Sequence, residues 1–442
     1  MEVTKRELYS NLLLAIYAAK KNFNVYLSDS NTYKLLISKK LISPGIIHTK
    51  SIVHGKKKAE FHKELFLSNF IITAIDEEHG VLDNLDYIKY FASNRLSDEE
   101  LKKISAFFCW GKYDFKKLKK NFNDQKNKFF LTGSPRTDIW KNSKLFSKKE
   151  DLYHRKPTIL ICTNFSFANN ITSYKSLIKK KRNEGYYKRS PGLLEKNKKF
   201  YFYQKKLIPH YISLINSLSK KYPNYKICVR PHPTENLTFW RKKLITKRNL
   251  FIDNSKTSTY WIQNCKYLIQ TGCTTGSEGI ISNKIVINYI PIKSKIGFGD
   301  FLKKISFNAK NEIEVCKIID SKKLPPIKFK SKLNERIFFR NNAAKKITKI
   351  WFDLSKKIGF NENNQVKIRF YLFIYENIKN ILRNLNLILK GKQKKFQALL
   401  NYKYPEFSES FIINETQNLS KSFNLKGIKI KKLGKKLFHF TY

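Results

Sequence analysis

The chain has 442 residues, 41% of them hydrophobic, which is enough for two domains of ordinary size with large apolar cores. Its 88 Lys and Arg against 34 Asp and Glu give a formal charge of +54, so nucleic acid, an anionic membrane surface or acidic substrates should be attracted to it. No run reaches the roughly 18 apolar residues of a transmembrane helix, and Glu2 and Glu7 interrupt the start in a way that argues against a signal peptide. We therefore expect a cytoplasmic protein, soluble or peripheral on the inner membrane.

Two features of the composition limit what the charge means. The basic residues are spread along the chain rather than gathered in one stripe, and they accompany an enrichment in Ile and Asn, which indicates a compositional drift at every position. The six cysteines are also widely spaced, with no CxxC pair and no Cys/His cluster of metal-ligand spacing. We expect buried free thiols in a reducing cytoplasm, and no bound metal or cofactor.

The first part of the chain alternates helix and strand. An amphipathic helix is expected over residues 6–22, and a strand over Asn24–Asp29. A further helix is expected over Leu96–Ile104, because it opens with a Ser–Asp start and an acidic first turn. The other strand-like runs are Gly45–Thr49, Phe70–Asp76, Ser105–Gly111 and Lys128–Gly133.

A second series of strands follows a polar, Lys-rich boundary near Ser147–Pro157. It includes a long helix around residues 195–221. Short apolar runs bounded by Gly, Asn or Asp and separated by helices are typical of parallel sheets in α/β domains. The strand-like runs of this series are Thr158–Phe165, Tyr225–Arg230, Asn249–Asn254, Lys266–Gly272 and Lys284–Ile290.

Two such series predict an α/β protein with two Rossmann-like domains that face each other across a cleft. We expect one domain over residues 1–150 and the other over 151–330. Helices over 331–375 should cross back to the first domain, and a basic helical extension and tail should occupy 376–442. A ligand is expected beyond the carboxyl ends of the strands, in the cleft.

The stretch Tyr225–Trp240 ends a strand with Arg230 and His232, each followed by a proline. Two prolines restrict the backbone and remove two donors, which favours a rigid turn that aims a side chain. An ordinary loop with two surface polar residues explains the pattern about as well. The loop Thr271–Asn283 then leads from a strand into a helix with Glu278 expected in the first turn, which suits either an anion site or simple N-capping by Thr or Ser.

Two strand ends of the first domain carry acidic residues. One run closes with Asp76, Glu77 and Glu78, and another closes with Arg136 and Asp138. Carboxylates at the carboxyl end of a strand suit acid/base or nucleophilic work. The plainer alternatives are that the first three are solvated or cap a helix, and that Asp138 pairs with Arg136 or caps a helix. No DxD pair occurs, which argues against a metal-bound nucleotide diphosphate.

Six short motifs carry a family resemblance over roughly residues 1–360. The motifs are DEEHGVLDN (76–84), FFCWG (107–111), FLTGSPRTD (130–138), TNF (163–165), VRPHPTEN (229–236) and TTGSEG (274–279). Taken together, they resemble those of the bacterial surface-carbohydrate biosynthesis proteins, a group similar to the GT-B glycosyltransferases that use CMP-activated 3-deoxy-octulosonic acid (Kdo) or related nonulosonic acids. The family commonly has Asn where this chain has Ser134.

The resemblance implies a glycosyltransferase that moves a Kdo-like sugar from a CMP donor to a glycan or glycolipid acceptor of lipopolysaccharide or capsule, without a metal. It implies Asp138 as the nucleophile of a retaining reaction and Glu78 or Glu77 as acid/base; an inverting relative would need only a base. The residues that it implies for the donor nucleotide are Arg230, His232, Thr274, Thr275, Ser277 and Glu278, and those for the substrate are Arg136, Asn164 and Ser166.

Beyond about residue 365 the sequence mixes aromatic, Leu and Ile residues with many Lys and Arg, which is typical of a helix on an anionic membrane surface. An ordinary packing helix with a basic face is equally compatible. Two functional alternatives stay open: a polyol-phosphate transferase of the CDP-glycerol type, and a nucleic-acid-binding protein. No known nucleic-acid-binding motif appears, so no specific nucleic acid is expected.

Overall fold

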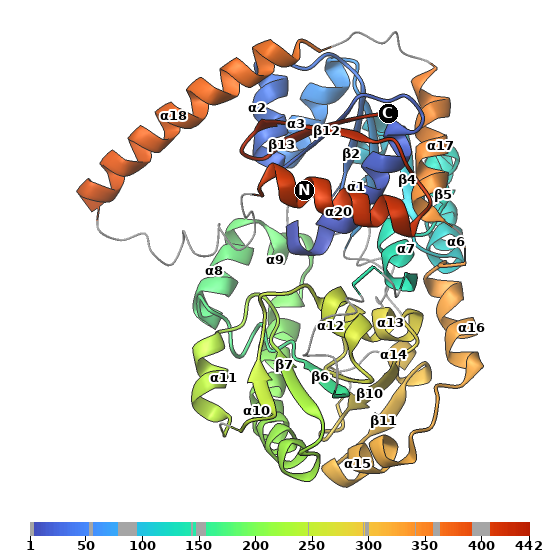
Figure 1. Ribbon diagram of the computed structural model, residues 1–442, viewed down its shortest axis with the longest axis vertical. Helices are drawn as coiled ribbons and strands as arrows, with labels where there is room; N and C mark the ends of the chain where they lie inside the picture. Colours follow the sequence, from blue (N-terminus) through green and yellow to red (C-terminus); the bar gives the residue numbers. More distant parts are fainter. Residues whose placement is uncertain are drawn as a thin grey trace.

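The computed structural model forms two α/β units, one above the other in Figure 1. The predicted fold class is confirmed: both units are built on parallel sheets, as in two Rossmann-like domains of the GT-B arrangement. The structure describes residues 4–52, 56–77, 95–142, 145–146, 156–245, 247–294, 296, 300–340, 342–356, 363–390 and 407–442.

The N-terminal sheet contains four parallel strands in sequence order. Its strands are continuous apolar runs because helices cover both faces; β4 (Ala106–Cys109) is buried along its whole length. Between them, α5 (Asp98–Lys103) begins as predicted, with Ser97 accepting a hydrogen bond from the Glu100 N–H. The other elements are α1 (Thr4–Ala19), α2 (Ser30–Ser38), β2 (Ile46–Thr49), α3 (Lys56–Leu67), β3 (Ile71–Ile75), α6 (Lys112–Asn121), η1 (Asn123–Lys128), β5 (Phe129–Leu131) and α7 (Pro135–Lys141).

The C-terminal sheet has six parallel strands in the order β11-β10-β9-β6-β7-β8. Read from β6 as the first strand, this is the Rossmann order, in which the chain winds outward in both directions from a central pair. The strands are β6 (Thr158–Cys162), β7 (Lys226–Arg230), β8 (Leu250–Ile252), β9 (Tyr267–Gln270), β10 (Ile285–Tyr289) and β11 (Phe307–Ala309).

Helices cover both faces of this sheet, and the predicted long helix is α10 (Leu193–Lys221). Its buried residues, among them Tyr211 and Leu214, join the apolar cluster on one face of the sheet. The other helices of this domain are α8 (Tyr174–Asn183), α9 (Tyr186–Arg189), α11 (Leu237–Lys243), α12 (Ser258–Asn264), α13 (Thr274–Ile281), α14 (Asp300–Lys304) and α15 (Glu312–Ser321). Four of the six cysteines are buried, Cys273 and Cys316 are half-buried, and all six are free.

One predicted strand has a different partner from the one that the strand series suggested. The segment β1 (Val25–Ser28) pairs antiparallel with β13 (Leu437–Thr441), which in turn pairs with β12 (Lys429–Gly434). These three strands form a separate sheet, so β1 does not extend the parallel sheet. The pairing buries Leu437 and Phe440 of the tail, and a local apolar pattern cannot specify a partner more than 400 residues away.

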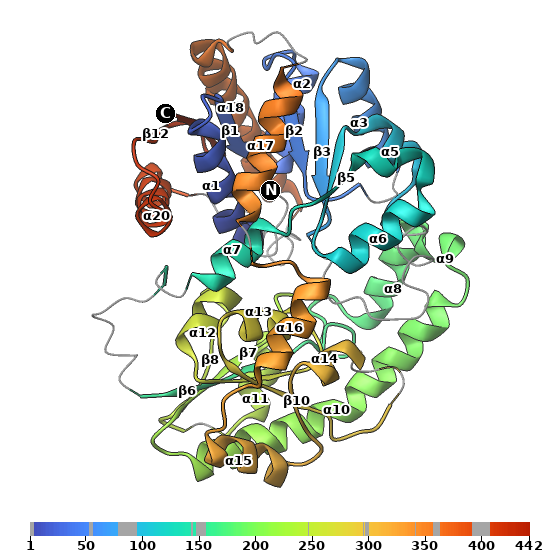
Figure 2. The same ribbon diagram turned by 90° about the vertical axis from the view of Figure 1, so that its right-hand side faces the viewer.

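The helices after the C-terminal sheet return along both domains. Helix α16 (Ile327–Arg336) contacts α13 and α6, and α17 (Ala343–Ser355) packs against α1 and α7, as Figure 2 shows from the side. Helix α18 (Gln365–Lys390) and α20 (Glu409–Ser422) follow. Among the helices that the structure describes, none is long and apolar enough to cross a membrane.

Candidate active site

The predicted site residues of the C-terminal domain surround the point where its strand order reverses. Strands β6 and β9 are neighbours, but the chain leaves β6 toward β7 and leaves β9 toward β10. Their following loops therefore diverge and leave room between them at the carboxyl edge of the sheet. Of the predicted donor residues, Arg230 ends β7 and His232 follows it, and the other four, Thr274, Thr275, Ser277 and Glu278, lie in the helix after β9, α13.

The turn after β7 is held by a residue to which the sequence analysis gave no role. The buried Glu235 carboxylate accepts hydrogen bonds from the His232 backbone N–H at 2.9 Å, the Thr163 hydroxyl at 2.8 Å and the Trp240 indole at 3.0 Å. Burial raises the pKa of Glu235, and these donors lower it. Glu235 thus ties the β7 turn to the β6 loop, and its place two residues after Pro233 was the signal for it.

The β7 turn carries two groups that can bind an anion, Arg230 and His232. Arg230 is the last residue of β7, is buried, and its Nε has no hydrogen-bond partner. The Nδ1 atom of His232 accepts a hydrogen bond from the Thr234 backbone N–H at 3.3 Å. A nitrogen that accepts an N–H bond carries no proton, so the neutral ring holds its proton on Nε2 as a donor.

The loop after β9 is shaped by Gln270. Its side-chain oxygen accepts hydrogen bonds from the backbone N–H groups of Gly272 at 2.6 Å and Cys273 at 2.8 Å. Gly272 has a φ of 85°, which favours glycine. Helix α13 then begins at Thr274, and its N-cap residue, Cys273, makes no side-chain cap hydrogen bond. Neither Thr nor Ser is the cap, and the first backbone N–H groups of a helix have no acceptor in the preceding turn of the helix, which suits an anion.

The prediction that Glu278 stands in the first turn of this helix is wrong. It is the fifth residue of α13, because the helix already begins at Thr274. Glu278 is 1% exposed, and burial raises the pKa of its carboxyl group while Thr259, Arg136, Arg230 and Ser258 lower it. It therefore lies beneath the anion-facing end of the helix and not at its tip.

Unsatisfied buried polar atoms gather at this edge. Buried donors and acceptors are nearly always paired in folded proteins, so a group of unpaired ones needs an explanation such as a ligand. Thr271 lies in the loop after β9, Asn164 after β6, and Arg230 at the end of β7. The atoms without a hydrogen-bond partner here are Asn164 Oδ1, Arg230 Nε, Thr271 Oγ1, Ser277 Oγ and Glu278 Oε1.

The two domains meet beside this edge. Helix α7 of the first domain packs on α13 of the second, where Ser282 donates a hydrogen bond to the Trp140 carbonyl at 2.9 Å. Gln263 of α12 donates to the Ile139 carbonyl at 3.0 Å. Gly279 permits α13 to lie close on the sheet, because a Cβ there would meet Leu268 and Val286 at 2.7 Å. Helix α7, which carries Arg136 and Asp138, is therefore in direct contact with α13, which carries Thr274, Ser277 and Glu278.

Arg136 is a residue of α7 whose charge reaches the second domain. It is buried, its guanidinium donates to the Glu77 carbonyl at 2.9 Å, and it lies over the rings of Trp140 and Trp110 at 4.9 and 5.7 Å. Burial lowers the pKa of Arg136, while the charges of Glu77 and Glu278 raise it. The positive charge of Arg136 therefore interacts with one carboxylate from each domain, Glu77 of the first and Glu278 of the second.

Glu77 is the carboxylate best suited to proton transfer. It is 5% exposed, its Oε2 lies 3.9 Å from Arg136 Nε, and this oxygen has no hydrogen-bond partner. Burial raises its pKa to about 7; Arg136, Arg6 and Lys50 lower it and Glu7 raises it. A carboxyl group that titrates near neutrality can both accept and release a proton. Glu78, the alternative acid/base, lies outside the described residues.

The other two acidic residues have structural partners. Asp76 is buried and forms an ion pair with Arg95 at 2.5 Å. Asp138 Oδ2 accepts a hydrogen bond from the Ala344 backbone N–H at 2.9 Å, at the start of α17, and Oδ1 lies 3.4 Å from Lys141 Nζ. Asp138 therefore holds the start of the returning helix through Oδ2, while its buried Oδ1 has no hydrogen-bond partner, and its role as nucleophile stays a prediction.

The two predicted substrate residues after β6 lie at the same edge as Arg230. Asn164 accepts a hydrogen bond from Gln204 through its carbonyl at 2.7 Å, and the Ser166 carbonyl accepts one from Asn170 at 2.8 Å. Both residues are half-buried.

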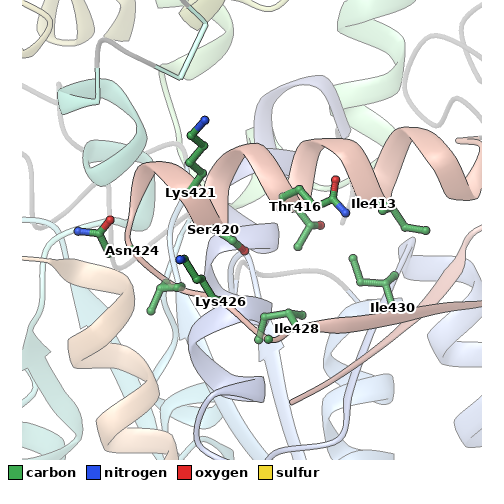
Figure 3. A pocket seen from close by; sticks show the side chains of 11 residues that line it. Ile413, Thr416, Ser420, Lys421, Asn424, Lys426, Ile428 and Ile430 are labelled. Atoms are coloured by element: carbon green, nitrogen blue, oxygen red, sulfur yellow. The ribbon is translucent and has the colours of Figure 1, made fainter.

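A separate cavity of about 650 Å³ lies between α20 and the chain entering β12. Its lining residues are drawn in Figure 3, and none of them is a predicted site residue.

Neither protein-family models nor curated protein sequences match the chain. Solved structures do. UDP-GlcNAc 2-epimerase of Methanocaldococcus jannaschii with UDP-GlcNAc and UDP shows 12% identity and a TM-score of 0.43, over 73% of this chain and 79% of that one. S. aureus MnaA with UDP shows 13% and 0.44, over 76% and 82%. The wall teichoic acid polymerase TagF shows 12% and 0.44, over 80% and 93%. At these values neither activity nor substrate is carried over to this chain.

Proposed function

We propose that this protein is a glycosyltransferase that moves a Kdo-like or other nonulosonic acid from a CMP-activated donor to a cell-surface glycan of lipopolysaccharide or capsule. The observation that carries the proposal is the group of unpaired buried polar atoms at the reversal point of the C-terminal sheet. Nucleotides bind at such points in Rossmann-like sheets. The family resemblance of the motifs supplies the choice of CMP and sugar.

The donor phosphate would lie between the β7 turn and the start of α13. Arg230 would supply a permanent positive charge, His232 would supply its Nε2 proton, and the backbone N–H groups of Thr274 and Thr275 would complete the anion site. The Ser277 hydroxyl oxygen and the Glu278 Oε1 atom would accept hydrogen bonds from hydroxyl groups of the nucleoside. CMP leaves as a monophosphate, so these donors can stabilise its charge without a metal ion.

The chemistry would take place beside Glu77 and Arg136, because the Arg136 guanidinium interacts with the charges of both Glu77 and Glu278. Glu77 accepts the proton of the acceptor hydroxyl, whose oxygen attacks the anomeric carbon. The bond from that carbon to the phosphate oxygen breaks, and its electron pair leaves with CMP. A base alone suffices for this inverting route, which Glu77 supports through its pKa of about 7. A retaining route through Asp138 stays the alternative and would require its carboxylate to leave the start of α17.

A nucleotide panel tests the proposal. Thermal shifts are measured with CMP, CDP, UMP, UDP and ADP, each with and without EDTA, because a ligand that binds only the native state raises the melting temperature. We expect CMP to give the largest shift, unchanged by EDTA. A shift with CDP alone would favour the polyol-phosphate transferase, and no shift with any cytidine nucleotide would overturn the proposal. Release of CMP from CMP-Kdo or a CMP-nonulosonate then identifies the sugar.

A further inference from the structure

Helix α18 exposes an apolar face to solvent. Figure 1 shows the helix extending beyond the rest of the molecule, to the left of the N-terminal domain. Val366, Phe370 and Phe373 are 78%, 65% and 65% exposed. Ile374, Ile378 and Ile381 continue the row at helical spacing. We call these six residues the outer stripe of α18.

The outer stripe is not the face by which α18 is held on the protein. Ile368 and Leu372 are buried on another side of the helix, in an apolar cluster with Leu36, Leu433 and Leu437. Glu376 also accepts a hydrogen bond from the Lys435 backbone N–H at 3.1 Å. The first half of the helix is thus fixed to α2 and the β12–β13 hairpin, and fixing it turns the outer stripe away from the core.

Basic residues accompany the outer stripe. Lys367, Arg369 and Lys379 are exposed on the same helix. Next to it lies a groove of about 490 Å³ that combines apolar, basic and two acidic side chains; its lining is Val366, Arg369, Phe370, Phe373 and Glu376 from α18, Glu409 from α20, and Lys432, Leu433 and Gly434 from β12. The neighbouring hairpin adds further lysines, from Lys429 to Lys436. An apolar stripe with a basic border is the pattern of a helix that lies in a membrane interface.

We propose that α18 lies in the surface of an anionic lipid bilayer, with the outer stripe among the upper acyl chains and its basic residues at the lipid phosphates. Charge complementarity favours this occupant. A second copy of the chain, docked stripe to stripe, would bring the lysines and arginines of two strongly basic molecules together. Nucleic acid would match the charge but leave the exposed phenylalanines without a role. The proposal does not depend on which reaction the protein catalyses.

Vesicle co-sedimentation of the full chain tests this surface. Vesicles containing phosphatidylglycerol are compared with vesicles of phosphatidylcholine alone. We expect binding to the anionic vesicles, and its loss in the triple variant Phe370→Ser, Phe373→Ser, Ile381→Ser. The matched control is Phe66→Ser, Leu67→Ser, which removes two exposed apolar side chains from α3 and should leave binding unchanged. Equal sedimentation of the triple variant and the unaltered chain would overturn the proposal.

Charge and insertion are separated by two further variants. Replacing Lys367, Arg369 and Lys379 by Gln should weaken binding to anionic vesicles by about fivefold for each charge. In Phe370→Trp, the new indole should show a blue shift of its emission when anionic vesicles are added, because the stripe enters the acyl region. No shift on bound vesicles would contradict insertion. A self-associated chain that the triple variant turns into a monomer, without vesicle binding, would assign the stripe to a second copy and also overturn the proposal.

Discussion

The two domains contribute to the candidate site in different ways. At the C-terminal edge, Arg230, Thr271 and Ser277 each keep a buried polar atom without a hydrogen-bond partner. At the N-terminal edge, Asp76 is paired with Arg95 and Asp138 with the start of α17. The C-terminal edge therefore offers a group of polar atoms that a ligand could bind, whereas in the N-terminal half Asp76 and the Oδ2 atom of Asp138 bind protein groups, and Glu77 Oε2 and Asp138 Oδ1 are buried carboxylate oxygens without a hydrogen-bond partner.

The difference indicates a division of labour. Unsatisfied atoms grouped at a reversal point suit ground-state binding of a nucleotide, which needs several fixed donors and acceptors. In the N-terminal half, Glu77 combines burial, a pKa of about 7 and a carboxylate oxygen without a hydrogen-bond partner. We therefore expect variants in one half to change nucleotide affinity and variants of Glu77 to change the rate of transfer.

The largest expected effect is that of Glu77→Gln on transfer. Loss of a general base typically reduces the rate by about 10²- to 10⁴-fold, while the affinity for CMP should stay within about twofold because Glu77 belongs to the other half. The measurement is the rate of CMP release beside a CMP titration. The exposed Glu60 on α3 gives the matched control Glu60→Gln, which should alter neither. Full activity of Glu77→Gln would show that Glu77 is not the general base, and would contradict the proposed separation of nucleotide binding and catalysis between the two halves.

The stability of the fold should also report on Glu77. Its pKa is raised from 4.5 to about 7 in the folded chain, so the unfolded chain loses this proton first as the pH rises. Stability from this group should therefore fall between about pH 4.5 and 7, by about 3 kcal/mol. Glu77→Gln should abolish this fall. Chemical denaturation of both proteins across that pH range checks it, and identical pH profiles would show that Glu77 titrates normally.

Asp138 distinguishes a structural from a chemical role. Asp138→Ala removes the acceptor for the Ala344 N–H and should lower the free energy of unfolding by about 1–2 kcal/mol. Asp138→Asn keeps an acceptor, so it should recover most of that stability and most of the activity. Denaturation and transfer assays on both variants decide the matter. A stable Asn variant without transfer, especially with a sugar adduct trapped on Asp138 of the unaltered enzyme, would establish the retaining nucleophile instead.

The smallest expected effect belongs to Glu278→Gln. The carboxylate is buried behind the start of α13, near Arg136 and Arg230. Removing its charge should weaken CMP binding by about tenfold, the size of one charge-assisted hydrogen bond, with a smaller effect on the rate of the bound complex. Isothermal titration and single-turnover rates separate the two quantities. An unchanged affinity would place Glu278 in the domain contact alone.

The sequence predicted the parts of this structure that depend on local patterns. Apolar runs such as Ile159–Cys162 mark strands covered on both faces, and the Ser97 cap marks the start of α5. The carboxyl ends of these strands also led to Arg230 and Glu77, because a parallel sheet gathers such ends on one edge.

Contacts between distant residues could not be predicted in this way. Asp138 binds the backbone of Ala344, about two hundred residues later, and β1 pairs with the tail. Glu235 organises a turn through Thr163, which comes from a different strand. Each of these depends on which surfaces meet after folding, and a local pattern carries no information about that. The misplaced start of α13 has the same origin, since Gln270 and not a cap residue fixes the loop before it.

The central claim is that a cytidine monophosphate binds at the reversal point of the C-terminal sheet, and Arg230 tests it most directly. CMP is titrated into the unaltered chain, into Arg230→Gln and into the control Arg241→Gln, an exposed arginine of α11 in the same domain. Loss of the buried cation should weaken binding roughly 10- to 100-fold, since a hydrogen bond to a charged group contributes about 1.5–3 kcal/mol. The control should bind as the unaltered chain does. Equal affinity in all three proteins would contradict the account.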